Sequence, residues 1–462
     1  MEQREGQQHE TQQQEDFYGL SHECVVAVSD ALERGDPESA RQLALPLHYS
    51  DAADLFERLS PEERRQLVEA LRPDFEPEIL IELDETLRDE IIDYLGFANL
   101  ANAIQELDSD DAVWLLDQLD EEEQRRVLES LPPDTQTILL QGLAYPEYSA
   151  GRLMARELVA VPAYWTVGET IDYLRASQQV PDEFYDIFVV DPRHRPVGKI
   201  GLAKLVRARR PVRLREIMEG DLPTVGVTTD QEEVAFLFRQ QDLVSAPVVD
   251  PAGRLVGVIT IDDVVDVIDE EAADDMLRLA GVGDTDLFAP ATTTAMRRIR
   301  WLVITLCNTI LASYVISHFE ATIEQIVALA VLMPIVAAMG GNAGMQVVTV
   351  TVRALATKEL GHGNVGRVVA KELAVGGMNG LVFAAIMGSI AFLWFGRMDL
   401  GMVLAAAMIF NMLWAGMAGT VIPLTLNRLK IDPALAAGPF LTTTTDVLGF
   451  FAFLGLATLF LV

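Results

Sequence analysis

Residues 438–462 read GPFLTTTTDVLGFFAFLGLATLFLV, an apolar run that contains a single acid, Asp446. A run of this length can cross the roughly 30 Å hydrocarbon core of a bilayer as a helix. A carboxylate at that depth costs about 2.5–3.5 kcal/mol on insertion scales, so it needs a partner, a function or a water-filled path. The stretch therefore predicts a membrane helix, and its acid predicts an ion pathway.

Charge is distributed unevenly along the 462 residues, whose formal net charge is -34. Residues 1–290 hold 62 acids and 25 bases, whereas residues 291–462 hold 7 acids and 10 bases. Only the second part contains apolar runs long enough to span a membrane. So acidic a soluble part argues against a nucleic-acid partner, which needs a basic surface, and favours a cation.

The N-terminal part begins with the polar sequence MEQREGQQHETQQQED, which has no apolar core for a secretory signal. We expect residues 1–24 to be a disordered polar tail. After it, leucine recurs every twelve residues from Leu47 to Leu143, and each interval has a helical pattern that ends at a breaker. This period predicts short helices stacked as an all-α superhelix over residues 25–145.

A second repeat has an offset of 59 residues, because DIFVVDPRHRPVGKI from Asp186 aligns with SAPVVDPAGRLVGVI from Ser245. Each copy reads strand, turn, strand and helix, and is bounded by Asp-Pro and Gly turn signals. The pair resembles tandem α/β CBS domains over residues 146–270.

Only the second copy ends in the TxxD element, Thr260 and Asp263, which holds adenine nucleotide in CBS pairs; the first copy has Gly201 and Lys204 there. A nucleotide site for ATP at Thr260 and Asp263 is therefore a secondary expectation. A purely structural CBS pair is the alternative.

The remaining sequence predicts a connecting helix over residues 271–300 and a five-span transmembrane domain over residues 301–462. Basic residues lie before the first span, between the second and third, and before the fifth, whereas the opposite side has only Arg397. By the positive-inside rule, the N-terminus is cytoplasmic and the C-terminus lies outside. The expected spans are about 301–319, 325–351, 373–396, 401–426 and 436–460.

The second span is unusually rich in small and polar residues. Its Pro334 removes a helical hydrogen bond, and its glycines let another backbone approach closely. Asn342 and Gln346 lie four residues apart, on one helical face. Helix packing alone accounts for any one of these residues, but the combined cluster favours a pore. The pore-lining candidates are Gly340, Gly341, Asn342, Gly344, Gln346 and Gly438.

The order of these parts resembles the MgtE family of magnesium channels. The sharpest matching pieces are GGNAGMQ (residues 340–346), RALATKEL (353–360) and DPALAAGPFLTTTTD (432–446). The resemblance implies a homodimer in which Asp446 holds a hydrated Mg²⁺ on the dimer axis and Thr442 contributes backbone oxygen. One acid per chain is reasonable, since Mg²⁺ dehydrates reluctantly. Gly438 departs from the pattern, because a more polar gate residue is expected there.

The acid run DDVVDVIDEEAADDM, residues 262–276, places several carboxylates on shared helical faces. Taken alone, such a run is a solvated face. The resemblance instead implies regulatory magnesium sites, where bound Mg²⁺ removes repulsion and draws domains together. The implied residues are Asp242, Asp263, Asp266, Glu271, Asp274 and Asp275, with Asp108, Asp110 and Asp111 as further candidates.

The leading hypothesis is a Mg²⁺-selective channel in the cell membrane that admits magnesium and is closed by cytosolic Mg²⁺. One alternative is a proton-coupled divalent cation exchanger that works through Asp446. Another is a membrane-anchored receptor for Mg²⁺ or nucleotide. An enzyme has the least support, because the motifs supply no combination of nucleophile, base and orienting group. The expected partners are a second copy of the chain, the lipid bilayer and Mg²⁺.

Overall fold

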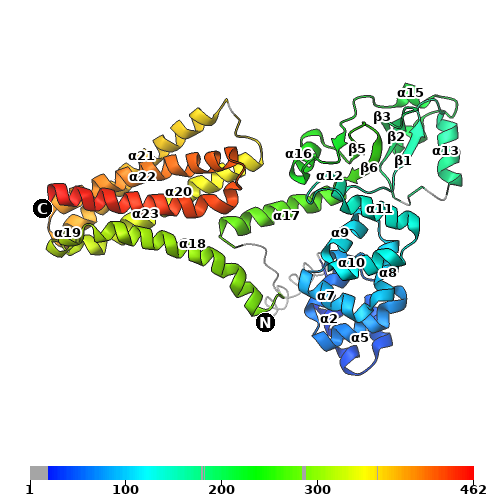
Figure 1. Ribbon diagram of the computed structural model, residues 1–462, viewed down its shortest axis with the longest axis horizontal. Coiled ribbons are helices and arrows are strands. Elements are labelled where there is room, and N and C mark those ends of the chain that lie inside the picture. Colours follow the sequence, from blue (N-terminus) through cyan, green and yellow to red (C-terminus); the bar gives the residue numbers. More distant parts are fainter. Residues whose placement is uncertain (1–18, 178–179, 182, 283–287, 362) are drawn as a thin grey trace, which may run out of the picture. The chain divides into compact units, whose positions relative to one another are not determined.

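The computed structural model describes residues 19–177, 180–181, 183–282, 288–361 and 363–462 (Figure 1). The chain divides into two compact units, one that extends to Asp269 and one that begins at Glu270. Within the described residues, the first unit contains helices and two small sheets, and the second unit contains only helices.

The N-terminal part of the first unit is entirely helical in the described residues, which confirms the predicted all-α class. Its first helix begins at His22, where the Ser21 side chain accepts a hydrogen bond from the Cys24 N–H. Ordered structure thus begins before residue 24, the expected end of the polar tail, and residues 1–18 lie outside the described residues. The helices are α2 (His22–Glu33), α3 (Pro37–Ala44), α4 (Tyr49–Arg58), α5 (Pro61–Leu71), η1 (Arg72–Asp74), α6 (Ile79–Glu82), α7 (Glu85–Leu95), α8 (Phe97–Glu106), α9 (Ser109–Gln118), α10 (Glu121–Ser130) and α11 (Pro133–Leu143).

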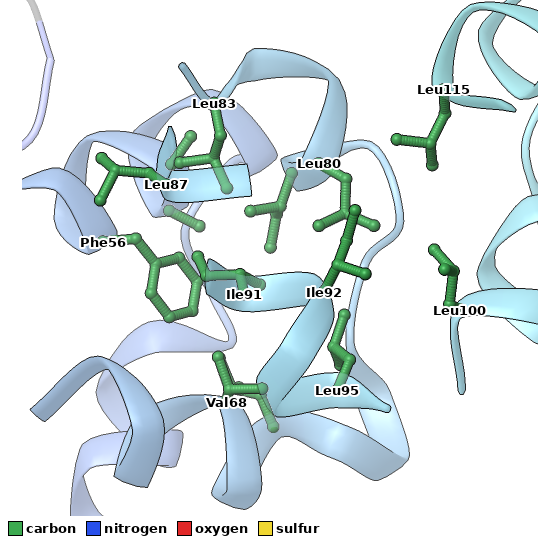
Figure 2. Packing of buried hydrophobic residues seen from close by; sticks show 14 of the residues in the cluster. Phe56, Val68, Leu80, Leu83, Leu87, Ile91, Ile92, Leu95, Leu100 and Leu115 are labelled. Atoms are coloured by element: carbon green, nitrogen blue, oxygen red, sulfur yellow. The ribbon is translucent and has the colours of Figure 1, made fainter. Parts of the chain in front are cut away.

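The twelve-residue leucine period marks the ends of these helices. Leu59 and Leu83 are buried C-caps, and each is followed at once by the N-cap of the next helix, Ser60 or Asp84. A leucine that closes one helix therefore faces the core while the next polar residue starts another helix. Figure 2 shows this core, in which the buried leucines pack with larger side chains such as Phe56.

The second part of the first unit contains the two sheets, whose orders are β1-β2-β3 and β4-β5-β6. In each sheet the central strand pairs with its first neighbour in parallel and with its second neighbour antiparallel. Both copies follow the predicted 59-residue offset, because β2 begins at Asp186 and β5 at Ser245. The elements are α12 (Ala150–Leu153), β1 (Val159–Pro162), α13 (Val167–Ala176), β2 (Asp186–Val190), β3 (Pro196–Gly201), α14 (Leu202–Arg207), α15 (Leu214–Ile217), β4 (Val225–Gly226), α16 (Gln231–Gln241), β5 (Ser245–Val249) and β6 (Leu255–Thr260).

Helix α17 (Ile261–Leu279) follows β6 directly and continues from the first unit into the second. The sequence predicts a connecting helix over residues 271–300, but the structure has two helices in this region. Helix α17 ends before Gly281, whose positive φ of 71° suits a chain reversal. The next helix begins at Ala291, and residues 283–287 lie outside the described residues.

The second unit contains five helices that are long and apolar enough to cross a membrane, as the sequence predicts. Several extend beyond the expected spans, because hydropathy detects the hydrocarbon crossing and not the helical turns outside it. Helix α22 is the most buried and packs against α20, α21 and α23, whereas α18 is largely exposed. The helices are α18 (Ala291–Ser317), the short α19 (Glu320–Gln325), α20 (Ala328–Ala356), α21 (Val365–Phe395), α22 (Met398–Arg428) and α23 (Pro433–Phe460).

Candidate cation pathway and acidic sites

Asp446 lies in the middle of α23, where its side chain is half-buried. Thr442, one helical turn earlier on the same face, is exposed. Among the described residues, Asp446 has no hydrogen-bond or ion-pair partner. A carboxylate in an apolar helix without a protein partner can be stabilised by a cation with its water shell.

The threonines around Asp446 form hydrogen bonds to their own helix. The Thr442 hydroxyl donates to the Gly438 carbonyl over 3.0 Å, and the Thr443 hydroxyl donates to the Pro439 carbonyl over 2.7 Å. The carbonyl of Thr442 in turn accepts the Thr445 hydroxyl at 3.1 Å. These hydroxyls are thus bonded within α23, whereas the Asp446 carboxylate has no such partner among the described residues.

The three glycines of α20 face three different surroundings. A Cβ on Gly340 would lie 2.2 Å from Asn411 Nδ2 of α22, and a Cβ on Gly344 would lie 2.8 Å from Leu441 of α23. Gly341 has open space at that position. The close approach of α20 to α22 and α23 therefore requires glycine at positions 340 and 344. Asn342 and Gln346 are exposed and share another face of α20.

Two groups of acids meet in the first unit, one at the start of α9 and one at the start of α17. Burial first and Asp263 second raise the pKa of Asp111 to about 7, and they raise that of Asp110 well above its ordinary range. Burial also raises the pKa of Asp263 to about 6, although the Thr260 hydroxyl donates to its carboxylate over 2.8 Å. We call this group the acidic interface; it comprises Asp108, Asp110, Asp111, Asp262, Asp263 and Asp266.

Neutral and ionic contacts hold α9 beside these acids. The Ser109 hydroxyl donates to Glu157 over 2.8 Å and accepts the Arg156 N–H at 2.7 Å. Farther along α9, Asp117 forms an ion pair with Arg152 of α12 over 3.1 Å. The carboxylates of the acidic interface are thus kept near one another by groups outside it, against their mutual repulsion.

A second acidic group lies where α17 ends and α23 begins. Arg278 pairs with Asp274 and with Asp432, each over 2.8 Å. Asp432 also caps α23 by accepting the Ala434 N–H at 2.8 Å. Burial, and next the charge of Asp432, raise the pKa of Asp275 above its ordinary range. We call this group the junction cluster; it comprises Glu271, Asp274, Asp275, Arg278 and Asp432.

Gly438 lies close to the same junction. A Cβ on this residue would lie 3.3 Å from the Met345 methyl group of α20 and 4.0 Å from the Leu279 carbonyl of α17. A side chain at this position would require the Met345 methyl group, the end of a flexible side chain, to shift by a few tenths of an ångström. The expected gate position is thus a tight contact with α20.

The predicted regulatory residues therefore lie in the acidic interface or in the junction cluster, with the exception of Asp242. Asp242 occupies the exposed, left-handed C-cap of α16 at a φ of 51°, and within the described chain no side-chain bond joins it to either group. In the described residues, no three His, Cys, Asp or Glu side chains are arranged to hold one metal ion directly. The acids could instead bind a cation through its water shell.

The sequence placed Asp262 in the acid run but not among the implied magnesium residues, and it did not single out Asp432 or Arg278. Asp262 stands in the acid run, and Asp432 begins the segment DPALAAGPFLTTTTD, so both carried a local signal. Arg278 carried none, since a base at the end of an acidic helix is ordinary dipole compensation.

Comparisons with known proteins cover most of the chain. A model described as a divalent cation transporter of the MgtE type matches residues 333–456, the MgtE intracellular N domain matches residues 47–148, and a CBS domain matches residues 214–270. The magnesium transporter MgtE of Thermus thermophilus is 33% identical over 457 residues, which are 96% of this chain and 99% of that protein. That of Bacillus subtilis is 29% identical over 440 residues, 95% of this chain and 98% of that protein.

A crystal structure described as the cytosolic domain of the Mg²⁺ channel MgtE in complex with ATP covers 53% of this chain and 99% of its own, at 33% identity and a TM-score of 0.49. The relatives that match nearly the whole chain all carry the name of one transporter. The chain belongs to the MgtE family.

Proposed function

We propose that this chain forms a homodimeric channel that lets Mg²⁺ enter the cell down its electrochemical gradient. The observation that carries the proposal is Asp446, a half-buried acid of a membrane helix with no partner among the described residues. Two such carboxylates across a two-fold axis supply a strong negative potential for a hydrated divalent ion. An inside-negative membrane potential adds about 2.3 kcal/mol per charge per 100 mV.

In this proposal each domain has its own role. Cytosolic Mg²⁺ is sensed by residues 25–145 and 146–270, the pore is formed by residues 301–462, and residues 271–300 connect the sensing domains to the pore. The N-terminus is cytoplasmic and the C-terminus is outside the cell, in agreement with the basic loops. Thr442 stands at the cytoplasmic side of Asp446, and the exposed face of Asn342 and Gln346 belongs to the pore lining.

In this proposal, cytosolic Mg²⁺ closes the channel by binding at the acidic interface and at the junction cluster. The surroundings of Asp111 and Asp263 support it. Burial first, and then the charges of neighbouring acids, raise the pKa values of both groups, and a bound divalent cation would remove the repulsion between these acids. A coupling of about 1–3 kcal/mol is enough to regulate a gate. We also propose Asp242 as a regulatory residue, because the resemblance to the family implies it.

A secondary proposal is modulation by ATP at Thr260 and Asp263. The bond between their side chains gives the TxxD element a fixed geometry at the end of β6. Asp263 also belongs to the acidic interface, so nucleotide and Mg²⁺ would act on one residue. Equilibrium dialysis with ATP, at low and high Mg²⁺, tests this; binding that is unchanged in Thr260→Val and Asp263→Asn would refute it.

Mg²⁺ flux into proteoliposomes tests the pore. We expect Asp446→Asn to lower flux by more than about tenfold, since the substitution keeps the shape and removes the one pore charge of each chain. Asp399→Asn is the matched control, because Asp399 pairs with Arg397 at the start of α22. This variant should show wild-type Mg²⁺ flux. Flux that survives Asp446→Asn would remove the pathway from α23.

The same vesicles separate the competing hypotheses. A channel carries Mg²⁺ current without a pH gradient, whereas a proton-coupled exchanger needs one. A receptor anchored by its spans would show no Mg²⁺ flux in the wild-type chain. Flux that is indifferent to Mg²⁺ on the cytoplasmic face would leave the pore intact but refute the regulatory sites.

A further inference from the structure

Asn411 is a buried polar side chain in the middle of α22. Only 1% of its surface is exposed, and its Nδ2 donates to the Val336 carbonyl of α20 over 2.8 Å. Its Oδ1 is buried without a hydrogen-bond partner among the described residues. The sequence reasoning did not single out this residue, and neither the pore proposal nor the regulatory proposal uses it.

Two glycines from two other helices pack directly on this amide. A Cβ on Gly340 of α20 would lie 2.2 Å from Asn411 Nδ2, and a Cβ on Gly449 of α23 would lie 2.9 Å from the same atom. Such distances leave no room for any larger residue unless the amide moves. Helices α20, α22 and α23 therefore meet at one side chain.

Packing alone does not explain an amide at this position. A buried polar atom without a partner costs about 1–3 kcal/mol, and an apolar side chain of similar size, such as leucine, would avoid that cost. What leucine could not do is donate to Val336. Pro334 leaves the Ala330 carbonyl without its helical partner, and the Val336 carbonyl lies between this proline and Gly340. The bond from Asn411 therefore ties α22 to the segment of α20 that joins the proline to the glycines.

The same contact reaches the proposed pore. Gly449 is three residues after Asp446, so the two lie on neighbouring positions of one helical face of α23. The amide thus fixes the turn of α23 that follows Asp446 relative to the glycine-rich turn of α20.

We infer that Asn411 is a positioning residue of the ion pathway, which sets the place of Asp446 by joining α20 to α23 through α22. This inference rests on the proposed pore role of Asp446. Asn411 itself touches no ion. Its loss should therefore change how well the pathway distinguishes ions, without abolishing the fold.

The first test compares Asn411→Leu with wild type in proteoliposomes that contain the full chain. The measurements are initial Mg²⁺ flux against Mg²⁺ concentration, the ratio of Mg²⁺ to Ca²⁺ flux, and the thermal midpoint. We expect the half-saturating concentration or the flux ratio to change by about fivefold, the factor that corresponds to one neutral hydrogen bond. The thermal midpoint should stay or rise, because the unpaired oxygen is gone.

Trp414→Phe is the matched control. Trp414 lies three residues after Asn411, and its buried Nε1 also has no partner among the described residues. The substitution removes a buried polar atom from the same helix without breaking a described hydrogen bond, so flux and selectivity should stay within twofold of wild type. Equal changes in Asn411→Leu and Trp414→Phe would overturn the inference.

A second pair of variants separates the hydrogen bond from the space that the amide fills. Gly340→Ala alone should lower flux and the thermal midpoint, because its Cβ collides with Asn411. Adding Asn411→Ala should restore the midpoint but not the flux ratio. If the double variant also recovers the wild-type ratio, Asn411 is only a spacer and the inference is wrong.

Asp446→Asn distinguishes this failure from failure of the pore proposal. Flux that persists in Asp446→Asn refutes the proposed function, whatever Asn411 does. The positioning role alone is refuted by a different pair of results: Asp446→Asn loses Mg²⁺ flux, and Asn411→Leu keeps the wild-type concentration dependence and ratio of Mg²⁺ to Ca²⁺ flux.

Discussion

Arg64 is a buried guanidinium in the helical part of the first unit. It donates to the Leu59 carbonyl over 2.7 Å and pairs with Glu90 over 2.7 Å. Arg88, two leucine periods later, donates in the same way to Leu83 over 3.3 Å. Each arginine thus bonds the carbonyl at the end of the preceding helix, a group that α-helices leave without an internal partner.

We predict that Arg64→Met destabilises this part by about 3–5 kcal/mol, because Glu90 is left partly buried without its partner. Hydrogen exchange of α4 and α5 in the full chain measures the effect. Arg65→Met is the control: its pair with Glu62 is exposed on both sides, and such pairs contribute about 0.2–1 kcal/mol. Similar losses in the two variants would contradict the structural role of Arg64.

At the scale of elements, the junction cluster joins α17 to α23. Arg278 and Asp432 are 154 positions apart in the chain, and their ion pair connects the helix of the acid run with the cap of the proposed pore helix. Because Arg278 also pairs with Asp274, its guanidinium stands among carboxylates that would otherwise repel one another. A divalent cation bound there would compete with it.

We therefore predict that Arg278→Gln lowers the cytosolic Mg²⁺ concentration that half-inhibits flux by about threefold. The size follows from the modest free energy of partly exposed ion pairs. Arg278→Lys keeps the charge and should behave like wild type. Inhibition that needs more Mg²⁺ in Arg278→Gln would show that the guanidinium holds the closed arrangement instead of competing with the ion.

At the scale of the whole molecule, the acidic interface should make the first unit sensitive to pH. The folded pKa values of Asp111, about 7, and Asp263, about 6, lie above their ordinary value of 3.8. Between about pH 4 and 7 the folded state therefore binds more protons than the unfolded state, so the free energy of unfolding falls as pH rises. Stability lost at high pH should return when Mg²⁺ neutralises the acids.

Hydrogen exchange of α9, residues 109–118, checks this prediction without divalent ions at pH 5.5 and pH 8. After correction for intrinsic exchange rates, protection should fall at pH 8 and recover on addition of Mg²⁺. In Asp111→Asn with Asp263→Asn, both the pH dependence and the Mg²⁺ response should be reduced. Protection that rises with pH would refute the electrostatic reading of these acids.

Much of the architecture followed from local sequence patterns. The five apolar runs predicted five membrane helices, and the leucine period and the 59-residue offset predicted the helical part and the paired sheets. These features depend on the hydrophobicity, caps and turn residues of short segments. The ends of the connecting region were not predictable, because no local signal shows where a helix outside the bilayer stops.

Composition alone selects the segments that are apolar enough to cross a membrane and shows that one of them contains a lone acid, Asp446, because burial in hydrocarbon acts directly on composition. Which distant side chains meet depends on the folded chain: Asp110 with Asp263, Arg278 with Asp432, and Asn411 with the glycines of α20 and α23. Such contacts depend on how whole helices pack, and the shape complementarity of packed surfaces leaves no periodic trace in the chain.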